Sequence, residues 1–290
     1  MTYRANVERT VAGLSVVEWP GGAPNVVALA GLSGTAWAWA PVAEAVPEAR
    51  LVAIDLRGRG RSSGLTGPTG LRAHARDVAS VVRELGLTDV VVVGHSMGAF
   101  LAPVVAQELG AGVARIVCVD GGIRPKFPFF LGPRLTRLTF KRQLGKIDKT
   151  YPTVEAFAER SRLGTALAGH PELMPMAMRM LEHELGGKPG SLRPRLDVPR
   201  AVSDAVDTFF GPDVPAAVDA LRVPADVLLA EHRMKPKDKP FIADAAAGEW
   251  VARQPLLRVH RLPGNHVTIM FRPELVSAIR GTLWPGILSS

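Results

Sequence analysis

The stretch Val90-Val91-Val92-Val93-Gly94-His95-Ser96-Met97-Gly98 joins an apolar run to a segment of helical character. Four consecutive valines are typical of a strand that is covered on both faces. Glycine two residues before and two residues after Ser96 lets neighbouring backbone approach closely, as a sharp turn between a strand and a helix requires. On such a turn the serine hydroxyl stands free above the end of the sheet, and the helix offers N–H groups beside it. The stretch therefore predicts a nucleophilic Ser96.

Other short runs rich in Val, Ile and Leu indicate further strands. They lie at 15–19, 25–30, 51–55, 116–119, 226–230 and 257–262. Helical patterns lie between them, at 69–85, 97–109, 244–253 and 273–283. Alternation of strands and helices predicts an α/β fold with a doubly wound, mostly parallel sheet.

The alternation stops between about Ile123 and Leu221, where the pattern is helical with Pro and Gly punctuation. We expect residues 1–122 and 222–290 to form the core and residues 123–221 to form an all-helical insertion, a cap over the carboxyl ends of the strands where α/β sheets bind ligands. Methionines recur there at every second position, so they cannot all share one helical face. They are Met174, Met176, Met178 and Met180. We expect them to pack in a core, or to give an apolar ligand an adaptable wall.

Composition narrows the class of protein. The 290 residues are 47% hydrophobic and carry a net charge of +8. Between Arg124 and Lys149, eight basic residues face one acid, Asp148; they are Arg124, Lys126, Arg134, Arg137, Lys141, Arg142, Lys146 and Lys149. This excess indicates a solvated basic face, or attraction to an anionic ligand or membrane surface. Because basic residues are otherwise spread along the chain, we expect no nucleic-acid partner.

The sequence also gives expectations about the cellular location of the protein and its need for a cofactor. No apolar run reaches the roughly 18 residues of a membrane span, and Met1 to Pro20 lack the apolar region of a signal peptide. The single cysteine, Cys118, excludes an intramolecular disulfide. These features favour a cytoplasmic protein without an integral membrane segment. We find no metal-ligand spacing and no phosphate-binding glycine loop, so we expect no metal and no cofactor.

Four motifs in order give the chain a clear resemblance over nearly its whole length. They are Leu29-Ala30-Gly31-Leu32-Ser33-Gly34, Asp55-Leu56-Arg57-Gly58-Arg59-Gly60-Arg61-Ser62, the Ser96 turn, and Pro263-Gly264-Asn265-His266. The chain resembles the α/β-hydrolase superfamily, in its serine-nucleophile, esterase- and lipase-like branch with a helical cap. In that family the segment from Asp55 to Ser63 is a structural turn, which we expect here also.

His266 is the best candidate for the general base. It lies just past the last strand-like run, where its ring could take the proton of Ser96 and return it to a leaving group. His95 sits beside the nucleophile and is expected to pack there or to contact substrate.

Two carboxylates compete as the third member of a triad, which must hold the imidazole in the right tautomer. The family usually takes the acid from the strand after the cap, where this chain has Glu231. A variant takes it one strand earlier, where Asp120 ends an apolar run and precedes two glycines. Aspartate suits the short reach, and the basic residues after Glu231 offer that side chain other partners. We favour Asp120 and keep Glu231 as the alternative.

The resemblance also implies an oxyanion hole made by the backbone N–H groups of Leu32 and Met97. Many relatives carry a His-Gly pair in the first loop, whereas this chain has Ala30-Gly31. The backbone donors remain, so we expect no loss of activity. Trp37, just after this loop, is expected to pack in the core or to line the substrate pocket.

We expect a serine hydrolase that cleaves a carboxylic ester, or a lactone or thioester, of a small and largely apolar molecule through an acyl-enzyme. Two other classes stay open because the fold does not decide the reaction. One is different chemistry on the same triad, such as C–C bond hydrolysis, a lyase reaction or cofactor-free ring formation. The other is a ligand receptor that keeps its triad. A homodimer is left open.

Overall fold

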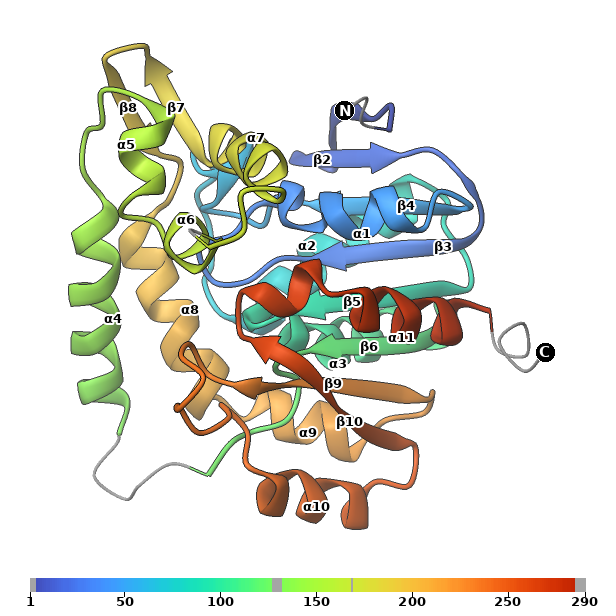
Figure 1. Ribbon diagram of the computed structural model, residues 1–290. Coiled ribbons are helices and arrows are strands. Elements are labelled where there is room, and N and C mark those ends of the chain that lie inside the picture. The colour runs from blue at the N-terminus through green and yellow to red at the C-terminus, as the bar shows by residue number, and fades with distance from the viewer. Residues whose placement is uncertain (1–3, 127–131, 168, 285–290) are drawn as a thin grey trace.

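The computed structural model describes residues 4–126, 132–167 and 169–284, which form a layered α/β body with a smaller lobe on one side (Figure 1). An eight-stranded sheet has the order β1-β2-β4-β3-β5-β6-β9-β10. Its strands are β1 (Val7–Val11), β2 (Leu14–Trp19), β3 (Gly22–Leu29), β4 (Ala49–Ile54), β5 (Val90–His95), β6 (Val113–Val119), β9 (Ala225–His232) and β10 (Leu257–Asn265). From β4 to β10 neighbours are parallel, while β1 and β2 are antiparallel at one edge. The expected doubly wound, mostly parallel sheet is confirmed.

Alternate residues of the central strands pack into two separate hydrophobic cores, one on each face of the sheet. On β3, Val27 and Leu29 join one core, whereas Val26 and Ala28 join the other. The first core is covered by α2 (Leu71–Glu84), α3 (Met97–Leu109), α9 (Asp213–Asp219) and α10 (Asp244–Arg253), and the second by α1 (Ala40–Ala45) and α11 (Pro273–Leu283). Because both faces are buried, the strands carry the continuous apolar runs seen in the sequence. Strand β1 is largely exposed and has no such run, so the sequence did not predict it.

The lobe beyond the carboxyl ends of the parallel strands is made by residues 133–210, which we call the cap (Figure 1). It contains α4 (Pro133–Ile147), α5 (Val154–Ala158), α6 (Arg162–Leu167), α7 (Met174–Glu184), β7 (Leu185–Lys188), β8 (Ser191–Pro194) and α8 (Val198–Phe210). Short 3₁₀ turns lie elsewhere, at Ala36–Trp39, Gly60–Ser62, Gly110–Gly112 and Thr268–Phe271. Helix α9, which the sequence analysis placed in the insertion, packs against α3 of the core.

The expectation of an all-helical insertion is wrong at one place. Strands β7 and β8 pair antiparallel as a hairpin. Gly187 and Gly190 have φ of +111° and +85°, a conformation that other residues adopt only at a cost. Gly187, which the sequence analysis took as helix punctuation, therefore lies in strand β7 of this hairpin, and Gly190 lies in its turn.

A buried ion pair joins the cap to the core. Arg59 Nη1 lies 2.6 Å from Asp204 Oδ2 of α8, and both side chains are at most 1% exposed. His74 of α2 contacts the same oxygen at 3.0 Å, and the Gly70 N–H donates to the other oxygen at 2.7 Å. Burial alone would raise the Asp204 pKa, but the bond from His74 and the charge of Arg59 outweigh it and hold that pKa well below its ordinary range.

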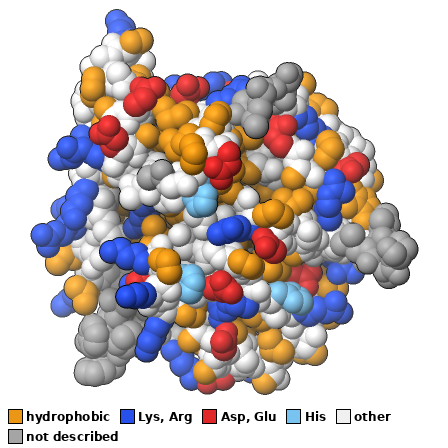
Figure 2. Space-filling view, in the orientation of Figure 1, with side chains coloured by type: hydrophobic (Ala, Val, Ile, Leu, Met, Phe, Trp, Pro, Cys, Tyr) orange, Lys and Arg blue, Asp and Glu red, His pale blue; other side chains and the backbone are white. Residues whose placement is uncertain are grey.

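The basic segment lies mostly on α4, whose Lys and Arg side chains are exposed along one margin of the molecule (Figure 2). Two of its members have partners elsewhere. Arg124 donates to the Gly211 carbonyl, and Lys126 pairs with Glu249. Within the ranges that the structure describes, no helix has both the length and the apolar character needed to cross a bilayer.

We predict that Asp204→Asn lowers the free energy of unfolding by about 3–5 kcal/mol, because it leaves the Arg59 guanidinium buried without its counter-charge. Denaturant unfolding followed by tryptophan fluorescence measures this loss. Asp219→Asn is the control, since its partner Arg253 and Asp219 itself are 56% and 43% exposed. That exposed pair should contribute at most about 1 kcal/mol. Equal losses in the two variants would contradict the prediction.

Candidate active site

Ser96 occupies the sharp turn that the sequence predicts, between β5 and α3. Its φ of +54° and ψ of −120° lie outside the regions that ordinary residues prefer. The Ser96 N–H donates to the Val119 carbonyl of the neighbouring strand at 2.9 Å. The turn therefore holds the hydroxyl at the carboxyl edge of the sheet.

Two glycines make this turn sterically possible. A Cβ at Gly94 would lie 2.1 Å from the Gly98 carbonyl oxygen, and a Cβ at Gly98 would lie 2.1 Å from that of Leu29. Backbone from β5, α3 and the end of β3 thus meets with no space for a side chain. The spacing of Gly94 and Gly98 around Ser96 is therefore explained by this close contact of backbone segments.

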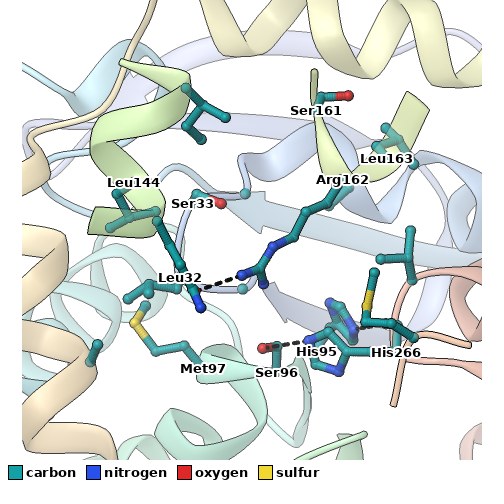
Figure 3. Close-up of a pocket in the computed structure, with 18 of the residues that line it drawn as sticks. Leu32, Ser33, His95, Ser96, Met97, Leu144, Ser161, Arg162, Leu163 and His266 are labelled. Atoms are coloured by element: carbon teal, nitrogen blue, oxygen red, sulfur yellow. Dashed lines mark hydrogen bonds between the residues drawn. The ribbon is translucent and has the colours of Figure 1, made fainter. Parts of the chain in front are cut away.

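His266 reaches Ser96 from the loop after β10 (Figure 3). Its Nε2 lies 3.0 Å from Ser96 Oγ, and its Nδ1 lies 2.5 Å from Asp120 Oδ2. An ionised carboxylate can only accept, so Nδ1 carries the ring proton and Nε2 is free to accept from the serine hydroxyl. The structure brings the predicted nucleophile, base and favoured acid into one continuous hydrogen-bonded chain.

Asp120 is held rigidly at the end of β6. Its side chain is buried, its N–H donates to the Leu228 carbonyl at 2.8 Å, and its Oδ1 accepts from the Ala230 N–H at 3.0 Å. Its φ of +45° turns the backbone so that the carboxylate leaves the strand toward His266. These contacts orient the acid before any substrate arrives.

Glu231, the alternative acid, lies elsewhere. Its side chain is 48% exposed, and its nearest basic contact is His232 at 4.0 Å. The structure therefore gives His266 the carboxylate of Asp120 and leaves Glu231 on the surface.

His95 supports the backbone of the candidate base. Its Nε2–H donates to the His266 carbonyl at 2.8 Å, and the two ring centroids lie 4.9 Å apart with the ring planes tilted by 36°. Burial and the nearby His266 lower the pKa of His95 to about 3, so its ring is neutral. It also lines the cavity above Ser96, as expected for one of its two predicted roles.

The two expected oxyanion donors lie beside Ser96. Met97 begins α3, and neither its N–H nor that of Leu32 meets an acceptor among the described residues. Arg59 lies behind both groups: its Nε donates to the Leu32 carbonyl at 2.9 Å, and its Nη2 contacts Met97 Sδ at 3.5 Å. A buried cation thus braces the loop where negative charge would develop.

Asp55 is the centre of the expected structural turn. It accepts from the N–H groups of Ala36 and Arg61 at 2.7 and 2.8 Å, and His183 of α7 contacts it at 3.0 Å. These bonds fix the core loops against the cap and lie outside the Ser96 hydrogen-bonded chain.

A cavity of about 770 Å³ opens over Ser96 between the core and the cap (Figure 3). Aromatic side chains form an apolar wall, with neighbouring ring centroids 5.9–6.4 Å apart; they are Phe100, Phe140, Phe209 and Phe241. Such an apolar chamber with a few polar groups is typical of a site for a small molecule.

Two side chains that the sequence linked to substrate lie differently. Trp37 is absent from the cavity wall; its Nε1–H donates to Glu8, and it packs edge-on against Trp19. The pocket-lining interpretation of Trp37 is therefore wrong. Among the four methionines, Met180 lines the cavity while Met176 and Met178 pack against two different cores.

The carboxyl of Glu184, at the end of α7, also lines the cavity. Burial, with a smaller contribution from the charge of Asp55, raises its pKa from an ordinary 4.5 to about 8. This group is therefore protonated at neutral pH. In the described part of the chain, no three His, Cys, Asp or Glu side chains gather as a metal site would require.

A family model described as the alpha/beta hydrolase family matches residues 26–279 of the chain. The chain belongs to the alpha/beta hydrolase family. The fold and the general class of hydrolase that the four motifs indicate are confirmed by this match.

Known relatives agree on the class but differ in substrate. A putative carbamate hydrolase, RutD, from Caulobacter segnis is 37% identical over 122 residues, which are 40% of this chain and 46% of that protein. The chain thus matches less than half the length of this curated relative. Among solved structures, E-2-(acetamidomethylene)succinate hydrolase has a TM-score of 0.75 at 19% identity, covering 96% of this chain and 99% of its own. An esterase of M. tuberculosis has a TM-score of 0.72 at 22% identity, covering 98% and 93%.

Three side chains at this hydrolase site escaped the sequence analysis. Arg59 was inside a motif interpreted as a structural turn, and its spacing gives no hint of the Leu32 carbonyl. Arg162 of α6 and Glu184 of α7 both line the cavity, and they come from cap helices without any motif. Their positions depend on how the cap packs, and no local pattern in the sequence encodes that.

We predict that Glu184→Gln stabilises the protein increasingly as the pH rises from 5 to 8. In this window the unfolded chain releases the Glu184 proton while the folded protein keeps it, so wild-type stability falls with rising pH. The variant lacks this penalty. Urea unfolding at pH 5, 6.5 and 8 gives the difference at each pH. Glu182→Gln, which removes an exposed carboxyl from the same helix, is the control, and an equal gain there would refute the assignment.

Proposed function

We propose that this hydrolase cleaves a carboxylic ester through an acyl-enzyme on Ser96. The observation that carries the proposal is the continuous chain from Ser96 Oγ through His266 to the buried Asp120, with distances of 3.0 and 2.5 Å. A serine next to a base that is itself oriented by a carboxylate is the arrangement that activates a hydroxyl for attack.

The reaction would proceed in two halves. His266 Nε2 takes the Ser96 proton as Oγ bonds to the acyl carbon, and it then delivers that proton to the leaving alcohol. Water, deprotonated by the same nitrogen, next attacks the acyl-enzyme, and the acid leaves as Ser96 regains its proton. Asp120 stabilises the imidazolium that forms in each half.

The free N–H groups of Leu32 and Met97 would hold the oxyanion of both tetrahedral intermediates. Loss of one such donor typically costs about 3–4 kcal/mol of transition-state stabilisation. The Arg59 side chain donates to the carbonyl of Leu32, the residue whose N–H is the candidate oxyanion donor. This bond supports the proposed role because it fixes the orientation of the loop at Leu32.

A carbamate is the second candidate bond, because the relative from Caulobacter segnis is named a putative carbamate hydrolase. Ser96 Oγ would attack the carbonyl carbon of a carbamate as it would attack that of an ester. Lactones and thioesters fit the same chemistry. Parallel assays on 4-nitrophenyl esters and 4-nitrophenyl carbamates decide between the bonds.

We predict that Ser96→Ala lowers kcat on a 4-nitrophenyl ester by about 10⁴- to 10⁶-fold, because the covalent step is lost. Mass spectrometry of the wild type treated with a fluorophosphonate should show a single adduct on Ser96. An active Ser96→Ala variant would refute the mechanism. Labelling without ester or carbamate turnover would point to other chemistry on the triad or to a ligand receptor.

We predict that Asp120→Asn lowers kcat by about 10⁴-fold, because an amide no longer fixes the His266 tautomer or stabilises its cation. Glu231→Gln is the matched control and should keep kcat within about twofold, since that side chain is half exposed and away from the triad. Steady-state kinetics on the same ester test both variants. The opposite ranking would return the acid to Glu231.

A further inference from the structure

Basic side chains outnumber acidic ones in the wall of the cavity. Four basic side chains line it, namely Lys146, Arg160, Arg162 and Arg233, against the single carboxyl of Glu184. That carboxyl is neutral at pH 7, because burial raises its pKa to about 8. The cavity therefore carries a net positive charge. An anion that enters it is stabilised by electrostatic attraction.

The charge of Arg162 lies close to the candidate nucleophile. Arg162 begins α6, and its side chain extends from the cap down into the cavity toward Leu32 and Ser96 (Figure 3). Arg233 interacts with the charge of Asp238 on its own loop, and Lys146 lies in the last turn of α4.

The guanidinium of Arg162 has one polar partner, the neutral amide of Gln143, whose Oε1 accepts from Nη2 at 2.9 Å. No carboxylate among the described residues lies within ion-pair distance of it. Its surroundings desolvate it enough to lower its pKa, yet an arginine stays charged at any pH the protein meets. Because no carboxylate of the described residues pairs with it, this solvent-exposed guanidinium is available to an anion that enters the cavity.

We propose that Arg162 binds a carboxylate of the substrate, at a distance from the ester that Ser96 attacks. A guanidinium presents a planar fork of donors that matches the two oxygens of a carboxylate. One fork with one positive charge suits a monoanion better than a phosphate dianion. The inference rests on the proposed function, and it narrows the substrate to esters or related acyl compounds that carry a free carboxylate.

Two esters that differ in one charge test this. Mono-4-nitrophenyl glutarate carries a free carboxylate, and methyl 4-nitrophenyl glutarate is its neutral counterpart with the same leaving group. We expect wild-type kcat/KM to favour the anionic ester by about 10- to 100-fold, through KM, as for a charge-assisted hydrogen bond.

Arg162→Gln should reduce this preference to less than about threefold, and Arg162→Lys should keep part of it. Arg142→Gln is the matched control, because it removes the same charge from the exposed side of α4, outside the cavity wall. A wild type without preference, or a preference that survives Arg162→Gln, would overturn the inference.

A binding measurement separates this inference from the proposed hydrolysis. In Ser96→Ala protein, glutarate should raise the midpoint of thermal unfolding, and Arg162→Gln in the same background should abolish that shift. If glutarate binds through Arg162 but neither ester turns over, the proposed hydrolysis fails and the carboxylate site stands. If both esters turn over equally and glutarate does not bind, the reverse holds. Tighter binding of inorganic phosphate than of glutarate would overturn the choice of a carboxylate.

Discussion

The contact of three backbone segments beneath Ser96 is the constraint on which the rest of the site depends. Gly98 lies against the Leu29 carbonyl, and Gly94 lies against the Gly98 carbonyl, with no space for a Cβ in either place. Close packing of backbone leaves little freedom to relax, so the end of β3 and the start of α3 take fixed positions. The loop after β3 then runs beside the serine, where a Cβ at Gly31 would lie 3.2 Å from the Ser96 Cβ.

A second layer of polar contacts connects this centre to the cap. Arg59 binds the Leu32 carbonyl on one side and Asp204 of α8 on the other, and Asp55 accepts from core N–H groups and contacts His183 of α7. These groups are buried and partnered, as the low dielectric of the interior demands. The residues that contact the cap are thus the same residues that hold the loop around Leu32 in place. A shift of the cap would therefore also disturb the loop.

Much of the core could be predicted from the sequence because its signals are local. Buried parallel strands need continuous apolar runs, and the serine turn needs glycine at two fixed positions. The choice between Asp120 and Glu231 is different in kind. Asp120 follows the end of β6, and Glu231 lies near the end of the neighbouring strand β9. The outcome depends on the left-handed turn at Asp120, which the residue type alone does not predict. Arg162 and Glu184 were missed because their place in the cavity is set by helix packing in the cap.

The position of the acid on β6 has a consequence for how the molecule can vary. Nucleophile and acid stand on adjacent strands, so the strand β9 and the loop after it supply no carboxylate to His266. At the start of that loop, the Arg233 and Met234 carbonyls accept from the His266 N–H and the Asn265 side chain. Further along, Phe241 packs against the His266 ring, with the ring centroids 6.2 Å apart. A change beyond Met234 that keeps the Phe241 contact therefore leaves the partners of His266 in place. The carboxylate that orients His266 and the loop that packs against the His266 ring thus come from two different stretches of chain.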